Sequence, residues 1–144
     1  MSTRSNIIIK EGDNTWLYYH HMDGYPEVVG KMLCLARLLT AYNIDYNADA
    51  KQIASAFLDY LKVVDPKFRY EGKGLPVYLH GDIEYLYTVE ISKDSIDIKV
   101  IAIDDFHILD DSNNHWDLYQ ICLQTGTPLW LKINDFGEVQ KACK

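Results

Sequence analysis

The sequence contains few cysteines, and they are widely spaced. Cys34, Cys122 and Cys143 are odd in number and form no Cys-x-x-Cys pair. A disulfide framework in a small secreted protein uses an even set, and a zinc knuckle uses closely spaced ligand pairs. The pattern therefore predicts a reduced, cytoplasmic protein in which Cys34 packs as a small hydrophobic residue of an apolar helix.

Long apolar runs are also lacking. No stretch approaches the roughly 20 residues that a membrane-spanning helix requires. Residues 1–6 carry a single basic residue, Arg4, and no apolar segment follows it in the manner of a signal peptide. We therefore expect no membrane segment and no leader sequence.

Basic residues are scarce relative to acidic ones: 14 Lys and Arg stand against 21 Asp and Glu, a formal charge of −7. Affinity for a phosphate backbone comes mostly from clustered Lys and Arg, so we expect no direct binding of nucleic acid. The acidity either keeps the protein soluble or forms a face that docks on a basic partner protein. Composition does not separate these two interpretations.

Familiar catalytic and cofactor motifs are missing. The chain has no Gly-x-Ser-x-Gly, no P-loop and no Gly-x-Gly-x-x-Gly. An acidic segment contains Asp104, Asp105, Asp110 and Asp111, but it lacks the spacing and central glycine of a calcium loop. We expect a solvated acidic loop that also serves as a docking patch, and neither a metal nor a cofactor.

The remaining composition is that of a globular protein, with 144 residues, 48% hydrophobic and 24% charged. Periodicity predicts one α+β domain over residues 1–144, a mostly antiparallel sheet with two helices packed on one face. The second helix begins near Asn47 as its N-cap, with Asp49 in its first turn. Strands are predicted at 6–10, 16–20, 77–80, 82–92, 95–104 and 129–133, helices at 27–42 and 47–64, and a polar connector at 67–74.

One segment, residues 18–31, is dense in residues that do chemistry or bend the backbone. In an extended strand His21 and Asp23 share a face, whereas His20 points the other way. This pair suits three roles: metal ligands, a general base with its orienting carboxylate, or a hydrogen bond that locks the corner between strand and helix. Pro26 suits the first position of the helix that follows.

Two pieces of the first 40 residues resemble a family of small uncharacterised proteins of phages, prophages and mobile elements. That family reads S-T-R-[SC], then Y-C-H-W-D-G-Y-P with V-G-K close behind. Residues 2–5 match the first motif, and 19–31 match the second except that His20 replaces cysteine and Met22 replaces tryptophan. The resemblance implies a genomic context, and the family has no established activity. Small accessory proteins of phages often bind and block host machinery.

Two hypotheses of function follow. The first is a protein-binding module that engages a host or bacterial protein through acidic and tyrosine-rich surface, for example an inhibitor of a defence system of the anti-CRISPR kind. The second is a small hydrolase or nucleotide-processing enzyme with His21 as base and Asp23 orienting it. In either case Arg4, Tyr25 and Lys31 are candidate binding residues, and Arg4 or Lys31 would hold an anionic group of a substrate.

Overall fold

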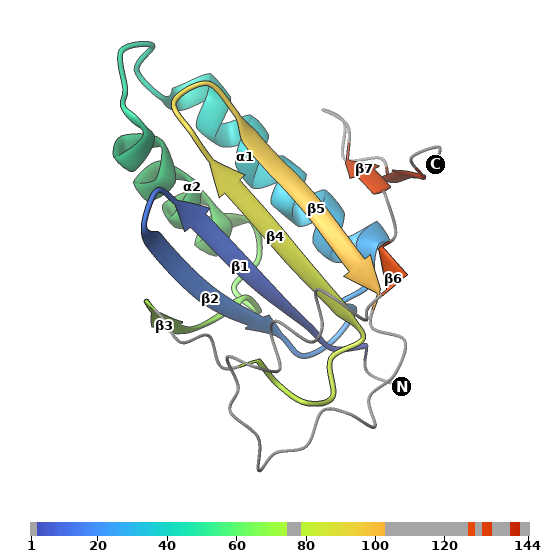
Figure 1. Cartoon of the computed structure of the whole chain (residues 1–144). Helices are drawn as coiled ribbons and strands as arrows, with labels where there is room; N and C mark the ends of the chain where they lie inside the picture. Colours follow the sequence, from blue (N-terminus) through green and yellow to red (C-terminus); the bar gives the residue numbers. More distant parts are fainter. Residues whose placement is uncertain (1–2, 75–78, 103–126, 129–130, 134–138, 142–144) are drawn as a thin grey trace.

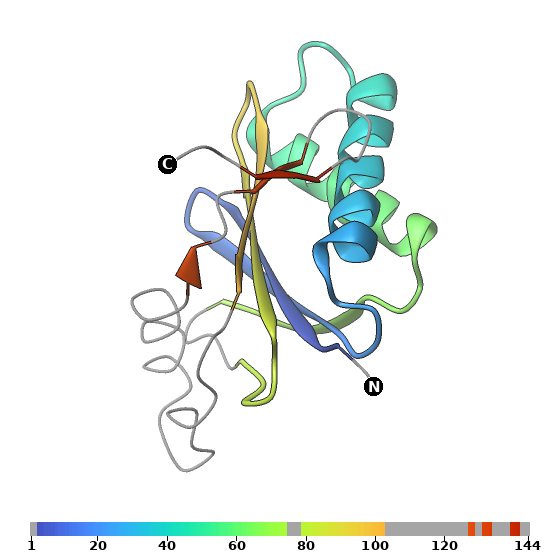
Figure 2. The ribbon, with the colours of Figure 1, turned by 90° about the vertical axis from the view of Figure 1, so that its right-hand side faces the viewer.

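The chain folds as a mixed sheet with two helices on one of its faces (Figures 1 and 2). The computed structural model describes residues 3–74, 79–102, 127–128, 131–133 and 139–141. The strands are β1 (Ser5–Glu11), β2 (Asn14–His20), β3 (Arg69–Lys73), β4 (Tyr85–Ile91), β5 (Ile96–Ala102), β6 (Thr127–Pro128), β7 (Leu131–Ile133) and β8 (Val139–Lys141). The helical elements are the π-helical turn η1 (Pro26–Gly30), α1 (Lys31–Asn43) and α2 (Ala50–Val64).

The main sheet has the strand order β3-β2-β1-β4-β5-β6. Strands β1 and β4 run parallel, and the other neighbours in this sheet are antiparallel. Strands β7 and β8 form a separate antiparallel pair. The predicted class, a mostly antiparallel α+β domain with its helices on one face, is confirmed.

Both predicted hairpins are present. Strands β4 and β5 pair along their whole length around a turn at residues 92–95, as the alternating pattern predicts. Strands β1 and β2 pair up to Glu11 and Asn14, so their loop contains only Gly12 and Asp13 rather than four turn residues. Gly12 takes a φ of 55°, the left-handed conformation that two-residue hairpin loops favour.

The first helical region begins at Pro26 and ends at Asn43, in agreement with the sequence pattern. The predicted start of the second helix is wrong. Its N-cap is Asp49, whose carboxylate accepts a hydrogen bond from the backbone of Gln52 while the Gln52 side chain accepts one from the backbone of Asp49. This reciprocal capping box satisfies two backbone donors, and Asn47 offers no equivalent.

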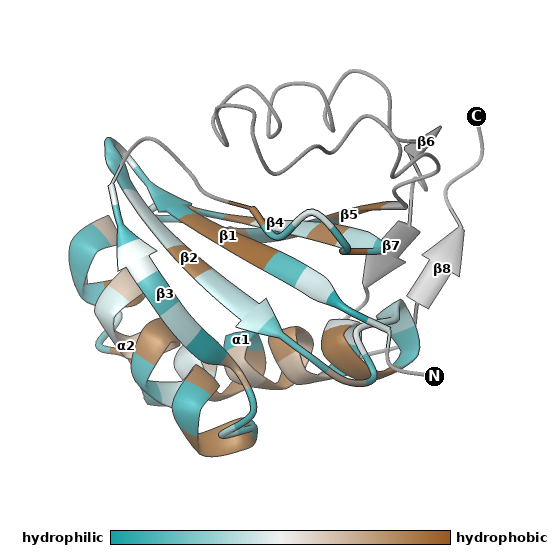
Figure 3. Ribbon diagram, turned by 90° about the horizontal axis from the view of Figure 1, so that it is seen from below, coloured by the Kyte–Doolittle hydropathy of each residue, from teal (hydrophilic) through white to brown (hydrophobic). Residues whose placement is uncertain are grey.

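The central strands are apolar on both faces. Ile7 and Ile9 of β1 face α1 and α2 and belong to the main core with Phe57, whereas Ile8 points to the opposite face. There it belongs to a second cluster that includes Leu86, the residue that breaks the alternation of β4. Figure 3 shows this apolar centre of the sheet above the helices. Burial from both sides explains why the Ile7–Ile9 run does not alternate.

Three predictions need correction. The connector at 67–74 contains a strand, β3, which pairs with β2 at the sheet edge. Of the strand predicted at 77–80, Leu79 and His80 are not in a strand, and 77–78 lie outside the described residues. Residues 139–141 of the terminal segment pair with β7. The acidic loop at 104–114, with Asp104, Asp105, Asp110 and Asp111, lies outside the described residues.

Candidate functional site

The corner after β2 is held by a close approach of Gly24 to the start of the chain. The Gly24 N–H donates to the Thr3 carbonyl at 2.8 Å, and its carbonyl accepts from the buried Tyr87 hydroxyl at 2.7 Å. A Cβ at this position would lie 2.8 Å from the Thr3 carbonyl oxygen and 2.9 Å from the Ser5 hydroxyl. Only glycine fits between these groups, so residues 23–26 act first as an anchor of the fold.

The structure does not join His21 to Asp23, so the predicted pair is wrong in its contact. Asp23 takes a φ of 55°, which ends the extended conformation on which the shared face depended. Its carboxylate accepts a hydrogen bond from the Tyr25 hydroxyl at 3.2 Å, and first its negative charge and then this hydrogen bond raise the pKa of that hydroxyl. His21 turns instead to Tyr19: the Tyr19 hydroxyl and the His21 Nδ1 are joined by a hydrogen bond of 2.9 Å.

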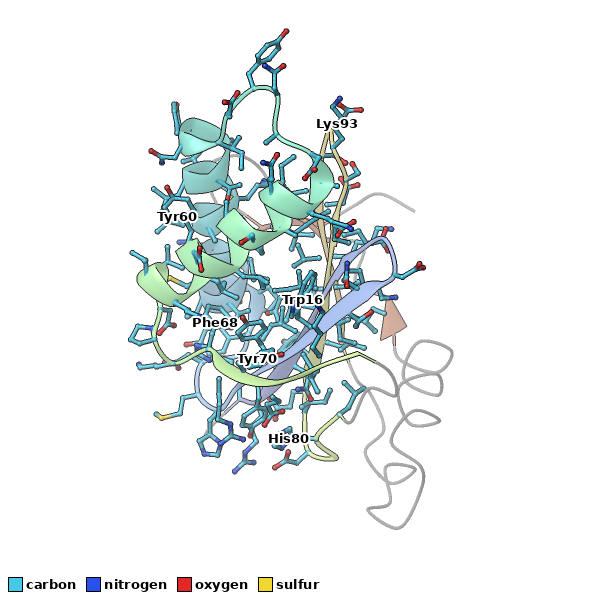
Figure 4. All side chains as sticks on the ribbon, turned by 90° about the vertical axis from the view of Figure 1, so that its left-hand side faces the viewer. Trp16, Tyr60, Phe68, Tyr70, His80 and Lys93 are labelled. Atoms are coloured by element: carbon cyan, nitrogen blue, oxygen red, sulfur yellow. The ribbon has the colours of Figure 1, made fainter. Side chains whose placement is uncertain are left out.

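A second imidazole lies on the same tyrosine. The His80 ring stacks on the Tyr19 ring with centroids 3.8 Å apart and planes 16° apart, and the His21 ring centroid is 5.9 Å away. Tyr19 is 4% exposed, while His21 is exposed and the His80 side chain is 32% exposed. One buried ring therefore carries two accessible imidazoles on the sheet face that α1 and α2 leave free. Figure 4 places His80 at the lower end of the sheet.

Strand β3 supplies the partners of His80. The His80 Nε2 lies 2.9 and 2.8 Å from the two Glu71 carboxylate oxygens, and the Arg69 guanidinium donates to the same carboxylate at 2.8 Å. A carboxylate only accepts, so Nε2 carries the hydrogen and the tautomer of His80 is fixed. Arg69 also lies over the Tyr19 ring, 4.9 Å from its centroid.

Arg4 completes this group from the start of β1. The pairing of β1 with β2 ends at Ser5 and His20, next to Arg4 and His21, and the positive charge of Arg4 acts on the Tyr19 hydroxyl. Its guanidinium forms an ion pair of 3.2 Å with Asp82, and both side chains are accessible at 34% and 56%. We call the six residues Arg4, Tyr19, His21, Arg69, Glu71 and His80 the Tyr19 cluster.

Electrostatics keep the central hydroxyl protonated. Burial raises the pKa of Tyr19 above its ordinary value, and the nearby Asp82 carboxylate acts in the same direction. The positive charges of Arg4 and Arg69 oppose this effect without reversing it. A protonated hydroxyl both donates and accepts, so Tyr19 can hold the neutral or the protonated ring of His21.

His20 faces the helices instead, as the strand geometry predicts. It is 1% exposed, its Nε2 lies 3.0 Å from an Asp65 carboxylate oxygen, and its ring meets the edge of Phe68 at 4.8 Å. Burial of Asp65 tends to raise its pKa, but the hydrogen bonds from His20 and the Lys67 backbone prevail, and the pKa is lowered. This pair ties the end of α2 to β2.

The other predicted residues are not brought into one site. Lys31 is exposed at the first position of α1, and Tyr25 contacts Asp23 rather than His21. Among the described residues no group of three or more His, Cys, Asp or Glu side chains is arranged to hold a metal ion.

Sequence reasoning identified Arg4 and His21 of the Tyr19 cluster and missed its other four members. The only signal for Tyr19 was its place two residues before His21, on the same face of a strand. Arg69, Glu71 and His80 come from a segment with no alternating pattern. The pairing of β3 with β2 brings Arg69 and Glu71 to Tyr19, and the His80 backbone N–H donates to the Asn6 side chain at 2.9 Å. Chemically the cluster offers two accessible imidazoles for proton transfer and two guanidinium groups for an anion.

Comparisons of the chain with models of protein families, with curated proteins and with solved structures each return no match. Within the part of the chain that the structure describes, no helix is both long and apolar enough to cross a membrane. The fold and the site thus define a small α+β domain with a polar cluster on the sheet face opposite its helices.

Proposed function

We propose that the protein is a binding module for another protein and that the loop between α1 and α2 is its main contact. The observation that carries this proposal is the exposure of two tyrosines, 80% for Tyr42 and 93% for Tyr46. Tyrosine provides a large contact area with one polar tip, and it is enriched at the energetic centres of protein interfaces. Tyr42 lies in the last turn of α1 and Tyr46 in the loop that follows it, so two such side chains stand four residues apart at this end of the helix pair.

The charge around these tyrosines favours a basic partner. Asp45 and Asp49 flank Tyr46, and no Lys or Arg occurs between Arg37 and Lys51. The loop is also ordered by its own contacts. The Asp45 carboxylate accepts from the Asn47 backbone at 2.9 Å, and the capping box at Asp49 fixes the start of α2. A preorganised loop loses less conformational entropy on binding than a flexible one.

A small acidic protein suits the blocking of a basic channel that normally receives nucleic acid. This is the mode we propose for an inhibitor of a host defence system, in line with the resemblance to phage and mobile-element proteins. Complementary charge would speed the encounter and make the affinity fall with rising salt.

The test is affinity capture from a bacterial host lysate, followed by reconstitution of the complex from purified components. Wild type is compared with Tyr42→Ser/Tyr46→Ser and with Val63→Ser, a matched control that removes a 74% exposed apolar side chain at the far end of α2. We expect one stoichiometric partner for wild type and the control, with loss for the double variant. No partner, or equal capture by all three forms, would contradict the proposal.

A further inference from the structure

Two imidazoles held on one buried tyrosine, with two guanidinium groups beside them, form an arrangement that the proposed function does not use. This arrangement lies at the end of the sheet marked by His80, whereas the α1–α2 loop lies at the other end (Figure 4). We propose that the Tyr19 cluster is an acid–base site that cleaves a ribonucleotide phosphodiester through its own 2′-hydroxyl group. The inference is independent of the proposed function, because it concerns a separate surface.

His80 has the geometry of a general base. Its Nε2 donates to Glu71, so in the neutral ring the lone pair is on Nδ1. Within the described chain Nδ1 makes no hydrogen bond, and the side chain is 32% exposed. A carboxylate that holds one imidazole nitrogen orients the ring and stabilises its protonated form once a proton is taken up. Glu71, itself fixed by Arg69, is therefore a positioning residue for His80.

His21 has the geometry of the matching acid. Its Nδ1 is held by the Tyr19 hydroxyl, and within the described chain its Nε2 makes no hydrogen bond on this exposed ring. When His21 is protonated, Nδ1–H donates to the tyrosine oxygen and Nε2–H is available for transfer. Tyr19 thus positions both rings: it stacks against one and hydrogen-bonds the other.

The guanidinium groups suit a phosphodiester. Arg4 and Arg69 are paired with Asp82 and Glu71 through one nitrogen each, and each guanidinium has five N–H donors. Further donors of both side chains can therefore bind phosphate oxygens. The two arginines and two acids cancel in charge, so a protonated His21 gives a local charge of +1 for a phosphodiester of charge −1.

The reaction is balanced without any further reactant. His80 takes the proton of the 2′-hydroxyl, and the 2′-oxygen forms a bond to phosphorus. The bond from phosphorus to the 5′-oxygen breaks, and His21 gives its proton to that leaving oxygen. The products are a 2′,3′-cyclic phosphate and a 5′-hydroxyl, and the arginines stabilise the charge that grows on the phosphate oxygens in between.

The net charge of −7 limits the length of the nucleic acid that the site can bind, but it does not exclude a short ribonucleotide. A long nucleic acid needs a continuous basic surface, which the acidic chain does not favour. A dinucleotide needs only the local contacts of one phosphate. We therefore expect cleavage of short single-stranded ribonucleotides.

The experiment uses the dinucleotide UpA and its deoxy analogue, with product analysis by chromatography. We expect wild type to convert UpA to uridine 2′,3′-cyclic phosphate and adenosine and to leave the deoxy analogue intact. His21→Ala and His80→Ala should each lower the rate by about 100-fold or more. Lys93→Ala, at the turn between β4 and β5 and far from His80 (Figure 4), is the control and should keep the wild-type rate.

In the cleavage assay, three results would overturn the inference: no cyclic phosphate with wild type, equal cleavage of the deoxy analogue, or undiminished rates in both histidine variants. If an alanine variant fails to fold, the site is tested by ligand binding to the wild-type protein alone.

In this second experiment uridine 3′-phosphate is titrated into the wild-type protein while the imidazole proton resonances are followed by NMR. Shifts confined to His21 and His80 support the site, and the absence of any shift at millimolar ligand overturns it. Glu71→Gln should lower kcat with little change in KM, as expected for a positioning residue.

Discussion

The substitution Gly24→Ala tests the corner that anchors β2 to the start of the chain. The added Cβ would lie 2.8 Å from the Thr3 carbonyl oxygen, 2.9 Å from the Ser5 hydroxyl oxygen and 3.0 Å from the Ser5 Cβ. The first of these atoms belongs to the backbone and cannot rotate away. The corner must therefore move as a unit.

The loss in the free energy of unfolding can be worked out from the contacts that this movement disturbs. Overpacking of a closed site costs about 1–3 kcal/mol. The same shift weakens two hydrogen bonds of Gly24, to the Thr3 carbonyl at 2.8 Å and from the Tyr87 hydroxyl at 2.7 Å. Each is worth about 0.5–1.5 kcal/mol net. Alanine also restricts the unfolded chain, and this effect alone raises the free energy of unfolding by about 0.4–1 kcal/mol. We expect the free energy of unfolding to fall by about 2–4 kcal/mol, a large part of the 5–15 kcal/mol typical of a domain.

Urea denaturation measures this change, with Gly12→Ala as the matched control. Unlike Gly24, Gly12 takes a conformation that favours glycine, with φ of 55°, and a Cβ there meets nothing within 4 Å. Its substitution should cost only the left-handed backbone strain, about 1–2 kcal/mol. The two variants therefore separate crowding from conformational strain.

A second substitution locates the crowding. The Ser5 hydroxyl is buried and has no hydrogen-bond partner among the described residues, so Ser5→Ala alone should be neutral or slightly stabilising. Combined with Gly24→Ala it should recover part of the loss, with a coupling of about 0.5 kcal/mol or more. The reasoning is refuted if Gly24→Ala is no worse than Gly12→Ala, or if the double variant shows no coupling.

Three further predictions concern single contacts. Asp49→Ala removes the N-cap of α2 and should lower the unfolding free energy by about 1 kcal/mol in urea titrations, whereas Asn47→Ala should change it by less than about 0.5 kcal/mol. Because the pKa of Asp65 is lowered in the folded state from its ordinary value of 3.8, its ionised form stabilises the fold at pH values above 3.8, and this contribution is lost as the pH falls through the folded pKa. In Asp65→Asn the free energy of unfolding should therefore fall less steeply as the pH is lowered. An unchanged pH dependence would show that the contact with His20 does not couple stability to pH. Tyr87→Phe leaves the carbonyl at the corner without its buried donor and should cost about 1–3 kcal/mol by thermal unfolding, with no change expected if water replaces the hydroxyl.

The elements with a clear period could be predicted from the sequence. Strands β4 and β5 alternate over most of their length, with Leu86 and Ile101 as exceptions, and α2 carries a regular apolar stripe. The strand β3, Arg69–Lys73, could not, because it is a short edge strand with exposed ends and a bulge in its pairing, and its order comes from β2 rather than from its own residues. The cap of α2 was misplaced because Asp45, Asn47 and Asp49 all suit the role, and only the position of Gln52 decides among them.

In the candidate site, only residues on or directly next to a predicted strand could be predicted from the sequence. His21 and Arg4 follow from the pairing of β1 with β2, which a hairpin pattern predicts. The predicted contact between His21 and Asp23 is absent because the backbone of Asp23, with φ of 55°, leaves the extended conformation that the prediction assumed. Glu71 and His80 are more than 50 residues further along the chain than Tyr19, and no local pattern encodes a contact over that separation.

The parallel pairing of β1 with β4 has a consequence for the protein during its synthesis. Ser5 pairs with Tyr85 and Glu11 with Ile91, so each contact joins residues 80 apart. At about 5–20 residues per second a ribosome needs roughly 4–16 s to make that intervening chain. During this interval β1 can pair only with β2, and the other edge of Ile7–Ile9, apolar on both faces, has no partner strand. Nascent chains of this protein should therefore depend on chaperones until β4 emerges, after which the same edge becomes the middle of the sheet.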